Sequence, residues 1–209
     1  MRLVLIRHAE SEHSQRGTIA DLLGCTGLTA NGLQQAYTLQ KRLRILRELA
    51  DCAALLSSPV LRARQTADIL ADTIPQCVIA DDADLREIVP GLADGMSWHS
   101  YQQTYGGFDL LEEPDRPFAP QGESWHVFLA RVQTTLQRLA DHYAERTVVA
   151  VTHAGFLIAT LFVLFAIPRP GTGARLDPRY TSLTIWELIG GNWRLERYND
   201  ACHLNAEPT

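Results

Sequence analysis

The sequence lacks two features that would place it outside the cell, a cysteine framework and a signal peptide. Its four cysteines lie far apart and form no C-x-x-C pair; they are Cys25, Cys52, Cys77 and Cys202. The first apolar segment begins directly after Met1, which leaves no space for a signal peptide. We therefore expect reduced thiols and a cytoplasmic protein.

The sequence also has no apolar run long enough to span a membrane and no excess of basic residues. Its most apolar run, "AGFLIATLFVLFAI" over residues 154–167, is shorter than a bilayer span and stops at Pro168, so it predicts a buried helix. The formal net charge of -5 argues against nucleic acid or an anionic membrane as a partner. Any anionic ligand must be held by a local site.

The chain does contain enough apolar residues for a core, because 46% of its 209 residues are hydrophobic. Short apolar segments alternate with helical patterns, which predicts one α/β domain over residues 1–209, with a mostly parallel central sheet and helices on both faces. The expected strands cover residues 3–6, 52–58, 77–82 and 147–153, followed by a hairpin of 181–189 and 193–198 around Gly190 and Gly191.

The expected helices start after recognisable capping residues. Thr29 can cap one helix, Pro59 precedes a second whose Leu61 and Leu70 are available to face the sheet, and "GES" opens a long helix that runs to Tyr143. Between these elements the periodicity fails over residues 88–121, where glycine, proline and aromatic residues dominate. We expect an inserted cap segment there, anchored by aromatic residues that include Trp98, Tyr101, Tyr105 and Phe108.

Two of the predicted strands, "LVLIRH" and "VVAVTH", end on a histidine, His8 and His153 respectively. The carboxyl ends of neighbouring parallel strands meet at one edge of a sheet, where ligands bind in α/β proteins. Arg7 lies beside His8, and "SSPVLRARQTA" brings Arg62 to the same edge. A phosphoryl group suits such a cluster, because its oxygens accept paired hydrogen bonds from guanidinium groups. Glu87, after the third strand, can serve as the proton carrier.

The motifs "LIRHAES", "SSPVLRARQTA", "LREIVPG", "QGES" and "VTHAGF", in this order, resemble those of the histidine phosphatase superfamily, which has the phosphoglycerate mutase-like fold. The resemblance implies that His8 is the nucleophile that becomes phosphohistidine, that Arg7 and Arg62 bind phosphate, that His153 is the second histidine of the pocket, and that Glu87 donates the proton. It implies no metal or other cofactor.

The sequence departs from the family at three positions. Ala9 and Ala154 follow the pocket histidines where glycine is usual, which is harmless unless the backbone needs a positive φ. Ser14 replaces the usual asparagine of the first motif and can still donate one hydrogen bond to phosphate. The remaining histidines have no metal-ligand spacing; they are His13, His99, His126, His142 and His203.

Three functions remain open, and the sequence favours the first. A phosphatase that hydrolyses small phosphomonoesters fits "LREIVPG", whereas phosphoglycerate mutases typically have a His-Tyr-Gly stretch and a basic loop after the glutamate. The alternatives are phosphoryl transfer of the phosphoglycerate mutase type and a phospholigand-binding module without catalysis. The sequence identifies neither the substrate nor the oligomeric state.

Overall fold

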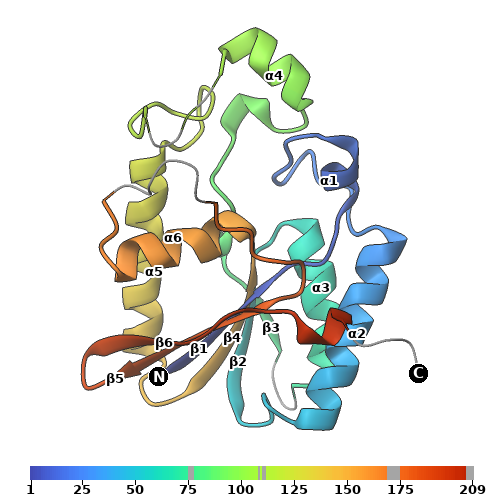
Figure 1. Cartoon of the computed structure of the whole chain (residues 1–209), viewed down its shortest axis with the longest axis vertical. Coiled ribbons are helices and arrows are strands. Elements are labelled where there is room, and N and C mark those ends of the chain that lie inside the picture. The colour runs from blue at the N-terminus through green and yellow to red at the C-terminus, as the bar shows by residue number, and fades with distance from the viewer. Residues whose placement is uncertain (75–77, 108, 110–111, 169–174, 206–209) are drawn as a thin grey trace.

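The computed structural model describes residues 1–74, 78–107, 109, 112–168 and 175–205. A six-stranded sheet in the order β3-β2-β4-β1-β5-β6 forms its centre (Figure 1). The strands are β1 (Arg2–Arg7), β2 (Cys52–Ser57), β3 (Ile79–Asp81), β4 (Thr147–Thr152), β5 (Leu183–Ile189) and β6 (Asn192–Asp200). The first four are parallel, and β5 and β6 form the antiparallel hairpin, so the predicted mostly parallel sheet is confirmed.

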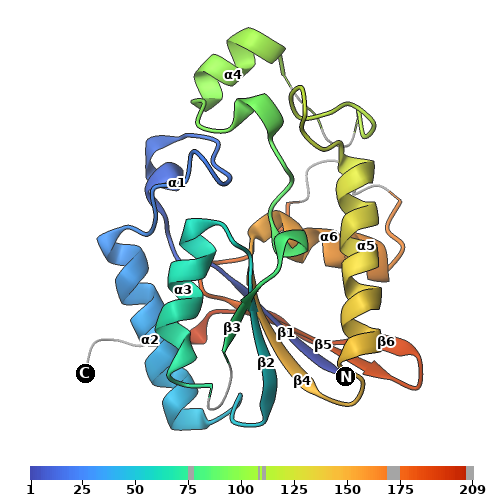
Figure 2. The ribbon, with the colours of Figure 1, turned by 180° about the vertical axis from the view of Figure 1, so that it is seen from behind.

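The two faces of the sheet are covered by different pairs of helices. Helices α5 (Trp125–His142) and α6 (Ala154–Leu164) pack on one face, and α2 (Ala30–Leu46) and α3 (Leu61–Ala71) on the other (Figures 1 and 2). Both faces are covered because the central strands are apolar on both sides. In β1, Leu3 and Leu5 pack in the core under α5 and α6, whereas Val4 packs in the core under α2 and α3. The apolar residues in the middle of β1 are thus buried on both faces of the sheet.

The capping residues act as the sequence predicts, but the face that α3 turns toward the sheet differs from the prediction. The hydroxyl groups of Thr29 and Ser124 accept hydrogen bonds from the first turns of α2 and α5. Leu61, however, is 42% exposed, so its predicted place against the sheet is wrong. Helix α3 instead turns Arg62 inward, one position further on, toward the end of the sheet that carries the histidines.

The segment over residues 88–121 lies beyond the carboxyl ends of the parallel strands (Figure 1). It contains the helix α4 (Trp98–Tyr105), which the sequence-based interpretation missed, although Ser97 caps it. Tyr101 and Phe118 pack there against Ile19, from the loop that follows α1 (Glu12–Arg16). The aromatic residues therefore anchor the segment as expected, except that Phe108 lies outside the described residues.

Two further expectations concern the cysteines, which should be reduced, and membrane-spanning segments, which should be absent. Cys25 and Cys202 carry free thiols, whereas Cys77 lies outside the described residues. Within the described ranges, no helix is both long and apolar enough to cross a membrane. The apolar run that begins at Ala154 forms the buried helix α6, as predicted.

Candidate active site

Sheet topology brings the two histidines together. Strands β1 and β4 are parallel neighbours with Arg7 opposite Thr152, so the residues that follow them, His8 and His153, lie side by side. Their ring centroids are 5.1 Å apart. Since α3 starts just after β2, the other parallel neighbour of β4, Arg62 reaches the same place from its first turn.

The hydrogen bonds of His8 determine which ring nitrogen is free to react. Nδ1 lies 2.7 Å from the carbonyl oxygen of Ala9, which can only accept, so Nδ1 carries the proton. Nε2 therefore keeps its lone pair and accepts a hydrogen bond from Nε of Arg62 at 3.1 Å. Burial, followed by the positive charges of Arg62 and Arg7, holds the pKa of His8 well below its usual value. His8 is thus a neutral imidazole at neutral pH.

Arg62 is a buried cation whose partners are neutral. It is only 2% exposed, and besides His8 it donates to the carbonyl oxygen of Ala20 at 2.9 Å and to Nδ1 of His153 at 3.0 Å. The charge of the nearby Asp21 acts on Arg62, but Asp21 forms its ion pair with Arg86, and among the described residues Arg62 has no ion pair of its own. A buried guanidinium without a counter-ion is costly, and an anionic ligand would offset that cost.

Arg7 adds a second cation with incomplete pairing. Its Nη1 donates to the carbonyl oxygen of Pro178, and its guanidinium carbon lies 4.0 Å from the centre of the Tyr180 ring. Its Nε is buried and has no hydrogen-bond partner in the described part of the chain. Burial lowers the pKa of Arg7. Arg7 and Arg62 together form a positive cradle beside Nε2 of His8.

His153 supports this cradle from behind. Its ring is fully buried, and because Nδ1 accepts from Arg62, Nε2 carries the proton and donates to Oγ of Ser58 at 2.8 Å. Burial, with the positive charge of Arg62, keeps the pKa of His153 well below its usual value. The structure thus brings His153 to Arg62, but not onto the wall of the cavity.

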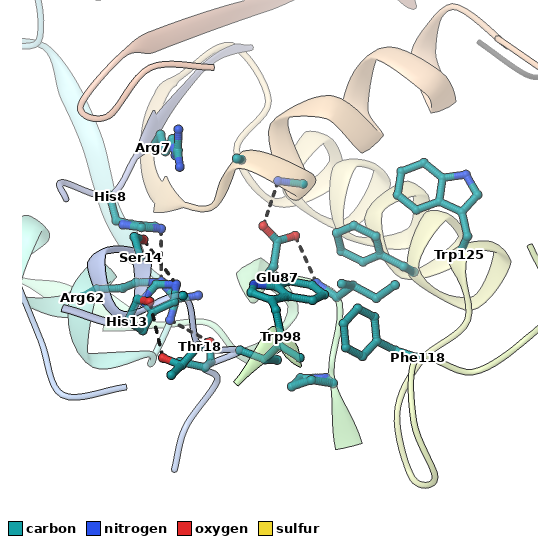
Figure 3. A pocket seen from close by; sticks show the side chains of 18 residues that line it. Arg7, His8, His13, Ser14, Thr18, Arg62, Glu87, Trp98, Phe118 and Trp125 are labelled. Atoms are coloured by element: carbon teal, nitrogen blue, oxygen red, sulfur yellow. Dashed lines mark hydrogen bonds between the residues drawn. The ribbon is translucent and has the colours of Figure 1, made fainter. Parts of the chain in front are cut away.

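Glu87 faces the cluster from across the cavity (Figure 3). Its carboxylate accepts from the backbone N–H of Gly155 at 2.8 Å and from that of Ile88 at 3.1 Å. Glycine at position 155 leaves room for this carboxylate, since a Cβ there would lie 2.0 Å from Oε1 of Glu87 and would force the Glu87 side chain to move. Arg131 of α5 holds the loop by donating to the carbonyl oxygens of Arg86 and Glu87.

The helix α1 supplies a histidine that the sequence analysis left without a role. His13 lines the cavity, its ring centroid 6.4 Å from that of His8, and burial with the nearby arginines lowers its pKa to about 4. Ser14 also lines the cavity, and its hydroxyl lies 3.2 Å from Oγ of Ser11. The sequence signal for His13 is its position two residues after "LIRHAES" and one residue before Ser14.

The cavity has a volume of about 380 Å³, which suits a small ligand. Figure 3 shows Arg7, His8, His13 and Arg62 on one side of it, and Phe118 and Trp125 on the other, with Glu87 between them. Ala9 and Ala154 adopt no positive φ, so alanine is harmless at both positions. Within the described ranges, no three His, Cys, Asp or Glu side chains gather as metal ligands would.

Comparisons with known proteins give the same family as the sequence motifs. The family model described as "Histidine phosphatase superfamily (branch 1)" matches residues 3–201. The chain is 31% identical to a putative phosphoserine phosphatase 2 from Hydrogenobacter thermophilus, over 79% of each chain. It is 27% identical to a phosphoglycerate mutase-like protein 4 from Arabidopsis thaliana, over 97% of this chain and 86% of that one.

Among solved structures, the protein YhfR from Bacillus stearothermophilus superimposes with a TM-score of 0.82 and 27% identity, over 97% of this chain and 98% of that one. The resemblance read from the motifs is therefore confirmed for family and fold. The relatives include phosphatases and a mutase-like protein, which are two of the alternatives that the sequence left open.

Proposed function

This chain belongs to the histidine phosphatase superfamily, and on that premise we propose that it hydrolyses small phosphomonoesters without a metal ion, through a phosphohistidine at His8. The observation that carries the proposal is the state of His8, a neutral imidazole whose Nε2 accepts from Arg62 and lies near Arg7, a second arginine with an unpaired Nε–H. A dianionic phosphoryl group would offset the positive charges of the two arginines, and it would place its phosphorus beside Nε2 of His8, the atom that can attack it.

In the first step Nε2 of His8 bonds to phosphorus as the ester P–O bond breaks. The Nε–H of Arg62 gives up its hydrogen bond to His8 and donates to a phosphoryl oxygen instead. The unpaired Nε–H of Arg7 donates to another phosphoryl oxygen. Protonated Glu87 gives its proton to the departing alkoxide, from the side of the cavity opposite His8. The guanidinium groups stabilise the charge that builds on the phosphoryl oxygens, which is the role a metal ion has in other phosphatases.

In the second step a water molecule enters from the space that the alcohol has left. Glu87, now a carboxylate, accepts a proton from the water as its oxygen bonds to phosphorus, and the N–P bond to His8 breaks. The hydrogen bond from Nδ1 of His8 to Ala9 keeps the ring oriented through both steps. The products are inorganic phosphate and the free enzyme.

His153 and Ser14 have supporting roles in this proposal. His153 fixes the fork of Arg62 through Nδ1, and its direct contact with the phosphoryl group, implied by the family resemblance, stays a prediction. Ser14 lies on the cavity wall and binds a phosphoryl oxygen in place of its contact with Ser11. The free thiols of Cys25 and Cys202 fit a reducing compartment, and we keep the cytoplasm as the proposed location.

Phosphomonoesters assayed for released phosphate in EDTA, with wild-type enzyme and with His8→Ala, test the proposal. Hydrolysis by the wild type and its loss in His8→Ala are expected. Mutase activity is tested in the same preparation, by following the interconversion of 2- and 3-phosphoglycerate. Isomerisation faster than phosphate release would favour the mutase alternative, whereas ligand binding without turnover would favour the non-catalytic one.

A further inference from the structure

The arginines that line the described part of the cavity lie at its phosphate end. Arg7 and Arg62 are the arginines of the lining, and the part of the wall that the structure describes beyond them has no lysine or arginine. The sequence has a single lysine, Lys41, which is exposed on α2 and does not line the cavity. Two nearby arginines are engaged elsewhere, because Arg86 pairs with Asp21, and Arg131 of α5 pairs with Glu123.

The rest of the wall is aromatic and aliphatic. It consists of Ile19, Ile88, Pro90, Trp98, Phe118, Trp125 and Phe128. Phe118, Trp125 and Phe128 are buried, whereas Trp98 is 52% exposed and so presents part of its indole to solvent and the cavity. Glu87 is the acidic residue of the lining, and it is already committed to proton transfer.

Hydrogen bonds and ring contacts fix this wall in place. The backbone N–H of Trp98 donates to the carbonyl oxygen of Gly17 at 3.1 Å, and that of Ile19 donates to Met96 at 2.8 Å. The Trp98 and Phe118 rings pack edge to face with centroids 5.8 Å apart. The apolar surface is therefore preformed, so binding an apolar group on it needs little reordering of the side chains.

These observations decide which alcohol fits beside the phosphoryl group. A carboxylate on the alcohol would lie among apolar rings and near Glu87, where the described wall offers it no lysine or arginine, and an unpaired charge is costly there. An apolar ring would instead displace water from Trp98 and its neighbours, with a gain in free energy. We infer that the substrates are phosphomonoesters of uncharged alcohols that carry an aromatic or bulky apolar group. This inference rests on the proposed function.

The inferred substrates differ from those that the names of the relatives suggest. A relative named for phosphoserine acts on an ester whose alcohol carries a carboxylate, and phosphoglycerate carries one too. We expect both compounds to be poor substrates here. The family chemistry at the phosphate end is retained, and the specificity comes from the apolar wall, which consists of Ile19, Ile88, Pro90, Trp98, Phe118, Trp125 and Phe128.

The test compares kcat/KM for four esters that all leave as primary alkoxides: 2-phenylethyl phosphate, ethyl phosphate, O-phospho-L-serine and 3-phosphoglycerate. Burial of the phenyl ring should raise kcat/KM for 2-phenylethyl phosphate roughly 10- to 100-fold above that for ethyl phosphate. The two esters with a carboxylate should fall below ethyl phosphate. A preference for either of them would overturn the inference while leaving the proposed function intact, whereas hydrolysis of none would overturn both.

Three substitutions of Trp98 test whether this side chain causes the preference for 2-phenylethyl phosphate over ethyl phosphate. Trp98→Ala should lower the ratio of kcat/KM for 2-phenylethyl phosphate to that for ethyl phosphate by about tenfold, from the loss of one aromatic contact. Trp98→Phe should retain most of the ratio. Trp98→Lys should raise kcat/KM for 3-phosphoglycerate by placing a cation on the wall. Because Trp98 is half exposed, all three variants should fold, which circular dichroism checks.

Tyr37→Ala is the matched control, since Tyr37 is another half-exposed aromatic residue but lies on α2, outside the cavity lining. Its ratio of kcat/KM values should equal that of the wild type. If Trp98→Ala left this ratio unchanged, or if Tyr37→Ala lowered it as much as Trp98→Ala does, the role of Trp98 in binding the apolar group would be contradicted.

Discussion

Gly155→Ala should displace Glu87 without disturbing the rest of the fold. Gly155 has no positive φ and lies in the first turn of α6, so alanine suits its backbone and improves the helix propensity by up to about 1 kcal/mol. The added Cβ, however, would lie 2.0 Å from Oε1 of Glu87, whereas real Cβ atoms essentially never approach within 3.0 Å. The carboxylate must therefore move by about 1 Å or more.

The cost follows from what Glu87 does in the first step. A displacement of about 1 Å at a reacting group can cost on the order of a hundredfold in rate. Loss of general acid catalysis altogether costs roughly a hundred- to ten-thousandfold. We expect kcat of Gly155→Ala to fall about a hundredfold with 2-phenylethyl phosphate, whose alkoxide needs a proton. The loss should be much smaller with 4-nitrophenyl phosphate, because nitrophenolate departs without a proton.

Single-turnover measurements with both esters isolate the phosphorylation step from slow hydrolysis of phosphohistidine. Glu87→Gln should show the same dependence on the leaving group, and adding Gly155→Ala to it should cost little more. Gly107→Ala is the control, because the described residues place no atom within 4 Å of the added Cβ there. Equal losses with the two esters, or an unchanged kcat of Gly155→Ala with the alkyl ester, would refute the role given to Glu87.

Three further predictions concern the cationic cluster and the buried histidines. EDTA should leave kcat/KM unchanged, and a loss that Mg²⁺ or Zn²⁺ restores would show that a metal takes part. Arg62→Lys should lower kcat/KM about a hundredfold or more, since lysine cannot reproduce the guanidinium fork; retention of activity within threefold would contradict this. Burial lowers the pKa of His13 and of His203 to about 4, so the folded protein binds fewer protons than the unfolded chain below pH 6.5. Stability should therefore fall as the pH drops from 6.5 toward 4, by about 1.4 kcal/mol per pH unit for each such histidine; equal urea midpoints at pH 7 and pH 5 would contradict it.

The sequence alone predicts the sheet and the cluster because both follow from local patterns. The apolar runs before His8 and His153 indicate strands, and parallel pairing of those strands suffices to bring the two histidines together. The capping residues Thr29 and Ser124 mark helix starts in the same way.

The parts of the site that the sequence did not reveal depend on contacts between distant segments. Gly155 matters only because Glu87 approaches it from another loop, and Trp98 lines the cavity only because its backbone bonds to Gly17. The place of His153 behind Arg62 follows from the direction in which α3 turns, the feature that also makes Leu61 exposed. No periodicity within a segment encodes such contacts.

The phosphorylated residue itself is the most direct test of the central claim. Wild-type enzyme is mixed with 4-nitrophenyl phosphate that carries a radiolabelled phosphoryl group, stopped in alkali at early times, and digested so that the labelled peptide can be identified. The account predicts an acid-labile, alkali-stable phosphate on the peptide that contains His8, and none in His8→Ala. Label on Ser11, Ser14 or Ser58, or full activity of His8→Ala, would contradict it.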